Sequence, residues 1–220
     1  MFSESQIREM RRDPVKTEKE IQRLTKELAD AKTSGWRTRE RELSGRLGEI
    51  KCRVTGEGKE GIECYDNALS VARKNHDRVN EVNYLSQLGK VHFAYNEGPQ
   101  SLMKALDFNE QALCIAKEIG DRNSECFIFG SLVTIYRFIG AVEKAVEFCR
   151  HGLSLAREIR DRYSEGIFLE NMGTAYMELG EEETAKRFKE QARSVYEEIG
   201  KSPADLFKKL LGQFDPDLTE

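Results

Sequence analysis

A stretch of 40 residues occurs twice in succession between residues 121 and 200. The pentapeptide DRNSE at Asp121 returns as DRYSE at Asp161, and Tyr136 returns as Tyr176, each 40 positions later. A fixed period of this length is typical of a solenoid, in which one helix pair cannot bury its apolar face alone and stacks on copies of itself. The repeat therefore indicates the architecture and favours an interaction surface as the function.

Two weaker copies of the pattern precede this pair. The four units start at residues 36, 77, 121 and 161, so the predicted array comprises residues 36–76, 77–120, 121–160 and 161–200. The extra residues of the second unit fall around the turn-forming run at residues 96–100, which predicts an enlarged loop there. The sequence thus predicts an all-α fold of about four helix pairs.

The ends of these helices carry recognisable signals. Gly140 and Gly180 are placed to end the first helix of their units, because glycine adopts the positive φ that closes a last turn. Asp161, like its counterpart in the preceding unit, is placed to cap the next helix, and Glu165 falls in the first turn near the positive end of the helix dipole.

The segments outside the repeats are predicted separately. Residues 1–13 are polar and expected to be frayed, and residues 14–34 form a helix that either covers the open end of the array or makes a coiled-coil contact. Residues 202–212 form a C-terminal capping helix, or else an exposed apolar stripe that docks another chain. These terminal helices leave a homodimer possible, and residues 213–220 are an acidic, disordered tail.

Composition excludes several classes of function. The net charge of −4 lacks the strong positive field of a nucleic-acid binder, so we expect no nucleic-acid partner. No apolar run is long enough to span a bilayer, and the first residues lack an apolar signal core, which indicates a cytoplasmic protein without a membrane partner. The five cysteines show no C-x-x-C spacing and fit small buried side chains in a reducing compartment.

No pattern indicates catalysis. Residues 56–61 match G-x-G-x-x-G, but helix is predicted on both sides where a dinucleotide site needs a preceding strand. The three histidines have no neighbours placed as a nucleophile relay or as paired metal ligands. We therefore expect a protein that is not an enzyme, with no catalytic residues, no cofactor and no metal.

The packing residues of the units resemble those of a known family. The dipeptides at Leu47-Gly48 and Leu88-Gly89, followed in later units by Tyr136 and Ala145, are similar to the tetratricopeptide repeat (TPR) pattern. The 40-residue period resembles the longer variety of that repeat. The resemblance covers about residues 36–200 and implies a right-handed α-solenoid with N-terminal and C-terminal capping helices.

In proteins of this family the first helix of each pair lines a concave groove that receives a peptide or a partner's helix. Carried over by register, the resemblance implies groove positions at Arg46, Glu49, Arg53, Asn83, Gln87, Lys90, Phe127, Thr134, Arg137, Phe138, Glu170, Asn171 and Thr174. The family's clamp for a chaperone's acidic tail needs a lysine and an asparagine where this chain has Gly45 and Glu49. We therefore expect no chaperone-tail binding by that route.

The combined interpretation is a non-catalytic scaffold or adaptor that binds another protein in the groove. The alternative is a regulatory sensor whose curvature changes when it binds a peptide or a small molecule. The sequence does not identify the partner.

Overall fold

The computed structural model describes residues 2–95 and 98–200, and these contain helices but no strands. The all-α fold is therefore confirmed. The predicted C-terminal helix (202–212) and acidic tail (213–220) lie outside the described residues, as does part of the predicted loop at 96–100. The helices are α1 (Glu4–Arg12), α2 (Pro14–Thr33), α3 (Arg37–Ile50), the π-helix η1 (Lys51–Thr55), α4 (Gly58–Lys74), α5 (Arg78–Ala94), α6 (Pro99–Ile119), α7 (Arg122–Phe138), α8 (Val142–Glu158), α9 (Arg162–Glu178) and α10 (Glu182–Glu198).

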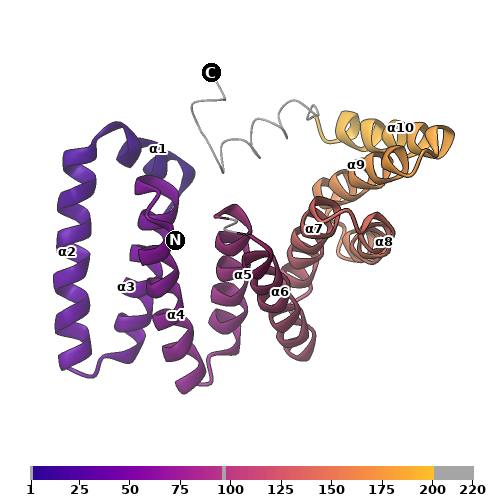
Figure 1. Ribbon diagram of the computed structural model, residues 1–220. Coiled ribbons are helices and arrows are strands. Elements are labelled where there is room, and N and C mark those ends of the chain that lie inside the picture. Colours follow the sequence, from indigo (N-terminus) through magenta and orange to yellow (C-terminus); the bar gives the residue numbers. More distant parts are fainter. Residues whose placement is uncertain (1, 96–97, 201–220) are drawn as a thin grey trace. The chain divides into compact units, whose positions relative to one another are not determined.

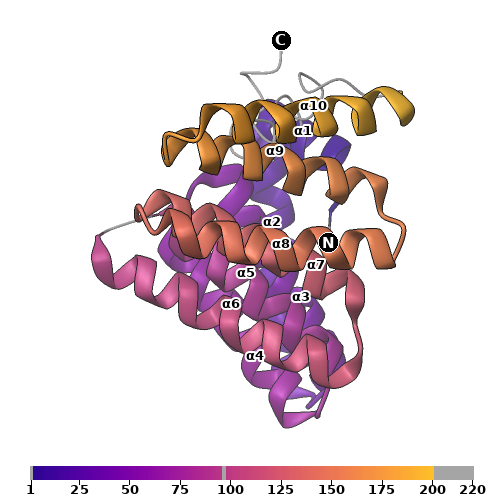
Figure 2. The same cartoon turned by 90° about the vertical axis from the view of Figure 1, so that its right-hand side faces the viewer.

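Consecutive helices pack on one another within each of two compact units, residues 1–108 and 109–220. In the N-terminal unit α2 packs on α3, α3 on α4, and α4 on α5 (Figure 1). In the C-terminal unit α7 packs on α8, α8 on α9, and α9 on α10 (Figure 2). Helix α6 crosses the boundary between the two units.

The repeated DRxSE motif builds the start of a helix. The side chain of Asp121 accepts hydrogen bonds from the backbone N–H of Ser124 (3.0 Å) and from its hydroxyl (2.6 Å). Asp161 caps α9 through the corresponding serine. The preceding turn closes on Gly120, whose φ of 68° is open to glycine at little cost. The predicted caps of α7 and α9 are therefore confirmed.

The glutamate of the motif has a role that the sequence did not predict. Glu125 is only 2% exposed, and its carboxylate pairs with Arg122 at 3.2 Å. In the next unit Glu165 is also buried and pairs with both Arg157 of α8 and Arg162 of α9. A buried carboxylate needs such a partner. The glutamate therefore stabilises the helix junction through its ion pair, in addition to its favourable interaction with the helix dipole.

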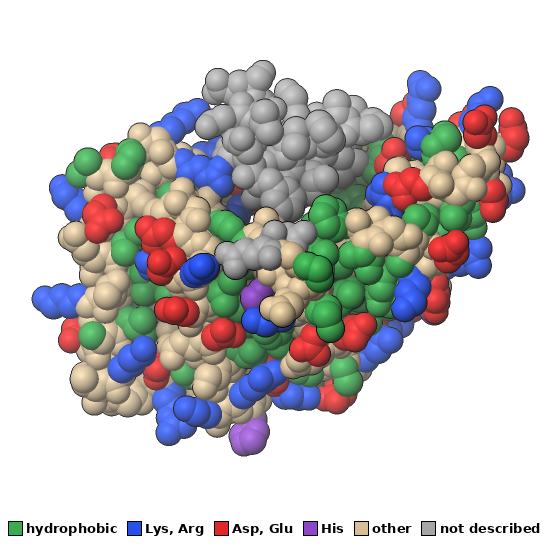
Figure 3. Space-filling model, in the orientation of Figure 1, with side chains coloured by type: hydrophobic (Ala, Val, Ile, Leu, Met, Phe, Trp, Pro, Cys, Tyr) green, Lys and Arg blue, Asp and Glu red, His purple; other side chains and the backbone are tan. Residues whose placement is uncertain are grey.

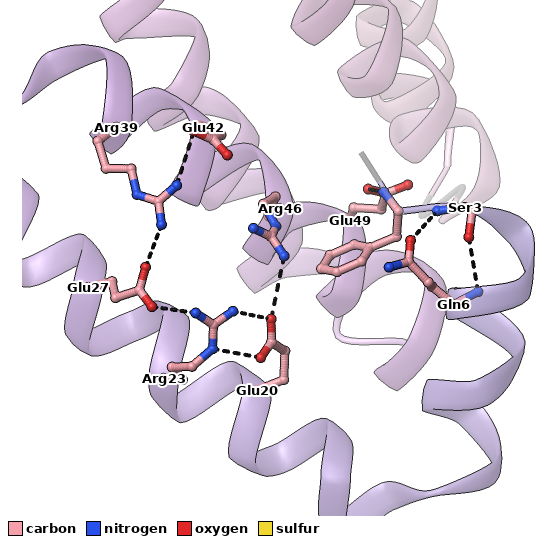
Figure 4. Close-up of polar contacts among 10 residues, drawn as sticks. Ser3, Gln6, Glu20, Arg23, Glu27, Arg39, Glu42, Arg46 and Glu49 are labelled. Carbon is pink, nitrogen blue, oxygen red and sulfur yellow. Dashed lines mark hydrogen bonds and ion pairs between the residues drawn. The ribbon is translucent and has the colours of Figure 1, made fainter.

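The N-terminal helices differ in part from expectation. Residues 4–12, which we expected to be frayed, form helix α1 with a capping box between Ser3 and Gln6. Helix α2 packs on the first pair, where Leu24 and Ala31 are buried in one core cluster with residues of α3. An ion-pair ladder that runs through Glu20, Arg23, Glu27 and Arg39 also joins α2 to α3 (Figure 4).

Candidate functional site

The predicted groove positions of the C-terminal unit lie on one face of α7 and one face of α9. Their spacing of three, four and seven residues places them in line along each helix. The two helices contact each other. The surface formed by these positions is called the α7/α9 surface below and comprises Phe127, Thr134, Arg137, Phe138, Glu170, Asn171 and Thr174.

Arg137 joins the two helices of this surface. Its Nη1 donates to Oδ1 of Asn171 at 3.3 Å, and its Nη2 lies 2.5 Å from Oε1 of Glu178. Two of the predicted groove positions, Arg137 and Asn171, are thus brought together, but the guanidinium is already engaged within the chain. A carboxylate from a partner would have to exchange with Glu178.

The other polar groups of the surface are turned to their own helices. The Thr134 hydroxyl donates to the carbonyl of Gly130, and the Thr174 hydroxyl donates to that of Glu170, both at 3.0 Å. The Asn171 amide donates to the carbonyl of Ile167 at 3.0 Å. Because these donors are used locally, they offer little hydrogen bonding to a peptide backbone.

What the surface offers instead is apolar area. Phe127 is 47% exposed and Phe138 is 59% exposed. Met177, which lies on α9 three residues after Thr174 and extends the α7/α9 surface, is 45% exposed. Figure 3 shows hydrophobic side chains gathered where Figure 1 places α7. Aromatic and methionine side chains are the types that concentrate in the cores of protein interfaces.

Gly130 lies in the middle of α7 on this surface, and no packing inside the described chain requires it. A Cβ built there meets no heavy atom within 4 Å. In contrast, a Cβ at Gly152 would strike the ring of Phe168, and one at Gly166 would strike the ring of Tyr196. Glycine within a helix costs about 1 kcal/mol relative to alanine, and no contact within the described residues offsets that cost at Gly130.

In the N-terminal unit three predicted groove positions are occupied by the chain's own N-terminal residues. The guanidinium of Arg46 stacks over the ring of Phe2, with 4.7 Å between them. Glu49 is buried and accepts a hydrogen bond from the backbone N–H of Phe2 at 2.8 Å. Arg53 donates to Glu4 at 2.7 Å. These positions do not form an open wall.

The remaining three predicted positions, Asn83, Gln87 and Lys90, are half-buried on α5. Burial, together with the nearby positive charge of Arg53, lowers the pKa of Lys90 to about 8, while the carboxylates of Glu4 and Glu49 oppose the shift. Lys90 is therefore a poorer candidate for an open peptide contact than the sequence suggested.

The described residues contain no group of three or more histidine, cysteine, aspartate or glutamate side chains that could hold a metal. Within the same ranges no helix combines the length and the apolar character needed to cross a bilayer. Burial raises the pKa of the Cys52 and Cys149 thiols to about 12, which disfavours their thiolates.

An open hollow between α8 and α9 was not anticipated. It is lined by residues that include Glu143, Glu147, Arg150, His151 and Tyr176. Arg150 donates to the hydroxyl of Tyr176 at 2.9 Å across it. Most of these residues lie on α8, the second helix of its pair. The sequence-based assignment of groove positions covered first helices and therefore did not include them.

Comparison with known proteins shows the fold. No protein-family model matches the sequence, and no curated protein matches it. The chain is similar in structure to a putative kinesin light chain from Podosopora anserina with nearly identical TPR-like repeats, with a TM-score of 0.70, 15% identity, and coverage of 90% of this chain and 95% of that one. A single-substitution variant of that protein gives a TM-score of 0.71 at the same identity and coverage. BtubC (BKLC) from P. vanneervenii gives a TM-score of 0.67 at 13% identity, over 90% of this chain and 88% of that one.

These observations define the fold as a TPR-like helical repeat, as the sequence predicted.

Proposed function

We propose that this chain is a non-catalytic scaffold and that its α7/α9 surface binds an apolar helix or peptide segment of another protein. Exposed Phe127, Phe138 and Met177 supply the contact area. Arg137, held by Asn171 and Glu178, supplies a charged edge to the same surface. This composition suits a segment with bulky apolar side chains better than a strongly acidic tail.

The observation that carries the proposal is Gly130. It carries a helix penalty that nothing in the described chain offsets, because a side chain there would enter open space. A partner whose backbone passes close to α7 at this point would explain the absence of a side chain. On this proposal the penalty is retained because a Cβ would hold the partner away.

Capture with matched variants tests the proposal. Parent, Gly130→Leu and Ser154→Leu proteins are immobilised and exposed to lysate of the source organism, and the captured proteins are quantified by mass spectrometry. Ser154 is an exposed position on α8, so the control adds the same side chain to the outer helix. We expect a partner that is retained by the parent and by Ser154→Leu but lost by Gly130→Leu.

The captured partner then permits a quantitative step. Segments of it are titrated against the parent and against Phe138→Ala by calorimetry. Loss of a half-exposed aromatic anchor should weaken binding by about tenfold or more. Retention of the same partners at equal affinity by Gly130→Leu and Phe138→Ala would show that binding occurs elsewhere.

A further inference from the structure

Helix α1 contacts the rest of the N-terminal unit through side chains spaced along its whole length. At its start Glu4 pairs with Arg53. At its end Arg11 donates to the backbone carbonyl of Arg53 through Nε at 2.7 Å and also through Nη2. Between them Ile7 is 1% exposed. One residue of η1 thus binds both ends of α1.

The apolar side of α1 continues into the core of the first repeat. Phe2 and Met10 are partly buried against the cluster formed by Leu24, Leu43 and Ile50. Phe2 is also covered by Arg46. The N-terminal residues therefore present the alternation expected of a bound amphipathic helix, with apolar anchors toward the protein and polar residues outside.

The receiving surface offers hydrogen-bonding groups because α3 ends irregularly. Residues 51–55 form a π-helix, and helix ends leave carbonyls without partners in the helix. The carbonyl of Cys52 accepts from the Tyr95 hydroxyl at 2.7 Å, whereas the carbonyl of Arg53 accepts from Arg11. The second of these acceptors is satisfied by a side chain from α1.

Several features leave α1 only lightly attached. It has nine residues, which is too short for a helix to be stable alone in water. Ile7 is its single fully buried residue. Asp13 adopts a non-helical conformation and separates α1 from α2, so α1 can leave without unwinding the helix that covers the core.

We propose that residues 2–12 are an intrachain ligand of the first repeat, and that the surface beneath them binds a partner's amphipathic helix of the same chemistry when α1 detaches. That helix would carry an aromatic residue, a carboxylate two positions later, a branched aliphatic residue three further on, and a guanidinium four beyond that. This proposal does not depend on binding at the α7/α9 surface, because it is tested with a peptide that copies the chain's own N-terminal segment.

The probe is an acetylated, fluorescent peptide of residues 2–13, titrated against the full-length chain by anisotropy. Arg11→Glu should loosen α1, because a carboxylate would then face the Arg53 carbonyl. Arg8→Glu makes the same charge change at an exposed position of α1. We expect the peptide to bind Arg11→Glu protein at least about tenfold more tightly than it binds the parent or Arg8→Glu protein, because release of α1 uncovers the site.

A second variant that should detach α1 covers the case in which Arg11→Glu leaves the helix in place. Ile7→Asp places a charge at the buried anchor, and Val15→Asp makes a similar change at a position that is 65% exposed. Ile7→Asp protein should bind the peptide, Val15→Asp protein should not, and a peptide that itself carries Arg11→Glu should bind neither. Circular dichroism verifies that each protein remains helical.

Two results would overturn the proposal. If folded Arg11→Glu and Ile7→Asp proteins bind the peptide no better than the parent, α1 is a permanent part of the fold. If the parent forms a concentration-dependent dimer that Arg11→Glu abolishes, α1 is exchanged between copies instead of serving its own chain.

Discussion

Arg122 at the start of α7 binds Glu158 at the end of α8, with both carboxylate oxygens 2.7 Å from Nη2. The same guanidinium pairs with buried Glu125. In the following unit Arg162 contacts Glu198 and Glu165 in the same way. One arginine in each of these two units therefore ties the start of the first helix to the end of the second.

The two arginines differ in what they leave behind when removed. Glu165 keeps a second ion pair with Arg157, whereas Arg122 supplies the ion pairs of Glu125 within the described residues. We expect Arg122→Ala to lower the free energy of unfolding more than Arg162→Ala does, because it leaves a buried carboxylate without an ion pair. Urea denaturation of both variants measures the difference, and equal losses would contradict the assignment.

Glycine positions on the two faces of the repeat should respond oppositely to alanine. Gly130→Ala should raise the free energy of unfolding by about 0.5 to 1 kcal/mol, because its Cβ enters open space and alanine favours helix. Gly166→Ala should lower it by about 1 to 3 kcal/mol, because its Cβ strikes the buried ring of Tyr196. Thermal melts followed by circular dichroism test both, and a stabilised Gly166→Ala would contradict the predicted clash with Tyr196.

Arg160 lies in the turn that joins two units. Glycine occupies the equivalent position in the turns before and after it. The φ of Arg160 is 59°, in the region where Gly120 and Gly200 have φ of 68° and 63°. A side chain there costs about 1 to 2 kcal/mol, partly offset in a glycine variant by greater freedom of the unfolded chain. Arg160→Gly should therefore raise stability by about 0.5 to 1 kcal/mol in urea denaturation, and a loss of stability would contradict this reading.

Lys90 should give stability a measurable pH dependence. Its pKa is about 8 in the folded protein and near 10.5 in the unfolded chain. The unfolded state therefore binds more protons between these values, so this residue makes the free energy of unfolding rise with pH across that range. The free energy of unfolding of the parent and of Lys90→Met should be measured at several pH values within that range. The difference between the two proteins isolates the contribution of Lys90, because the opposing contribution of Cys52 and other thiols is common to both. A difference that does not change with pH would refute the predicted dependence.

Thiol reactivity should follow exposure. Cys114 is exposed, whereas Cys126 and Cys149 are buried with raised pKa values because burial disfavours their thiolates. In the native protein at neutral pH a maleimide should label Cys114 first, and Cys114→Ser should remove the fast phase seen by mass spectrometry. A fast phase that persists in Cys114→Ser would indicate opening around the other thiols.

The features that could be predicted from sequence are those set by local chemistry. The cap at Asp161 and the turn glycine Gly140 follow from conformational preferences that act within a few residues. The period then determines which helices pack together. This is why the fold class could be predicted from a single sequence.

The candidate site was only partly accessible, because it depends on contacts between distant residues. Register assigned Arg137 and Asn171 to the groove faces of two different first helices, but their engagement with each other and with Glu178 depends on side-chain geometry. The polarity of residues 1–13 hid α1, since Ile7 gives a weak signal in such a short segment. The pairing of Phe2 with Glu49 spans 47 positions and has no sequence signature.

The matched junctions of α7–α8 and α9–α10 have an evolutionary consequence. Each 40-residue unit begins with the same aspartate cap and the same bridging arginine, and it ends with the glutamate that the arginine reaches. In a copy of residues 121–160 placed after Arg160, the aspartate cap and the bridging ion pair would form again. Lengthening of the array by a whole unit would therefore need no new mutations in the cap or in the bridging ion pair.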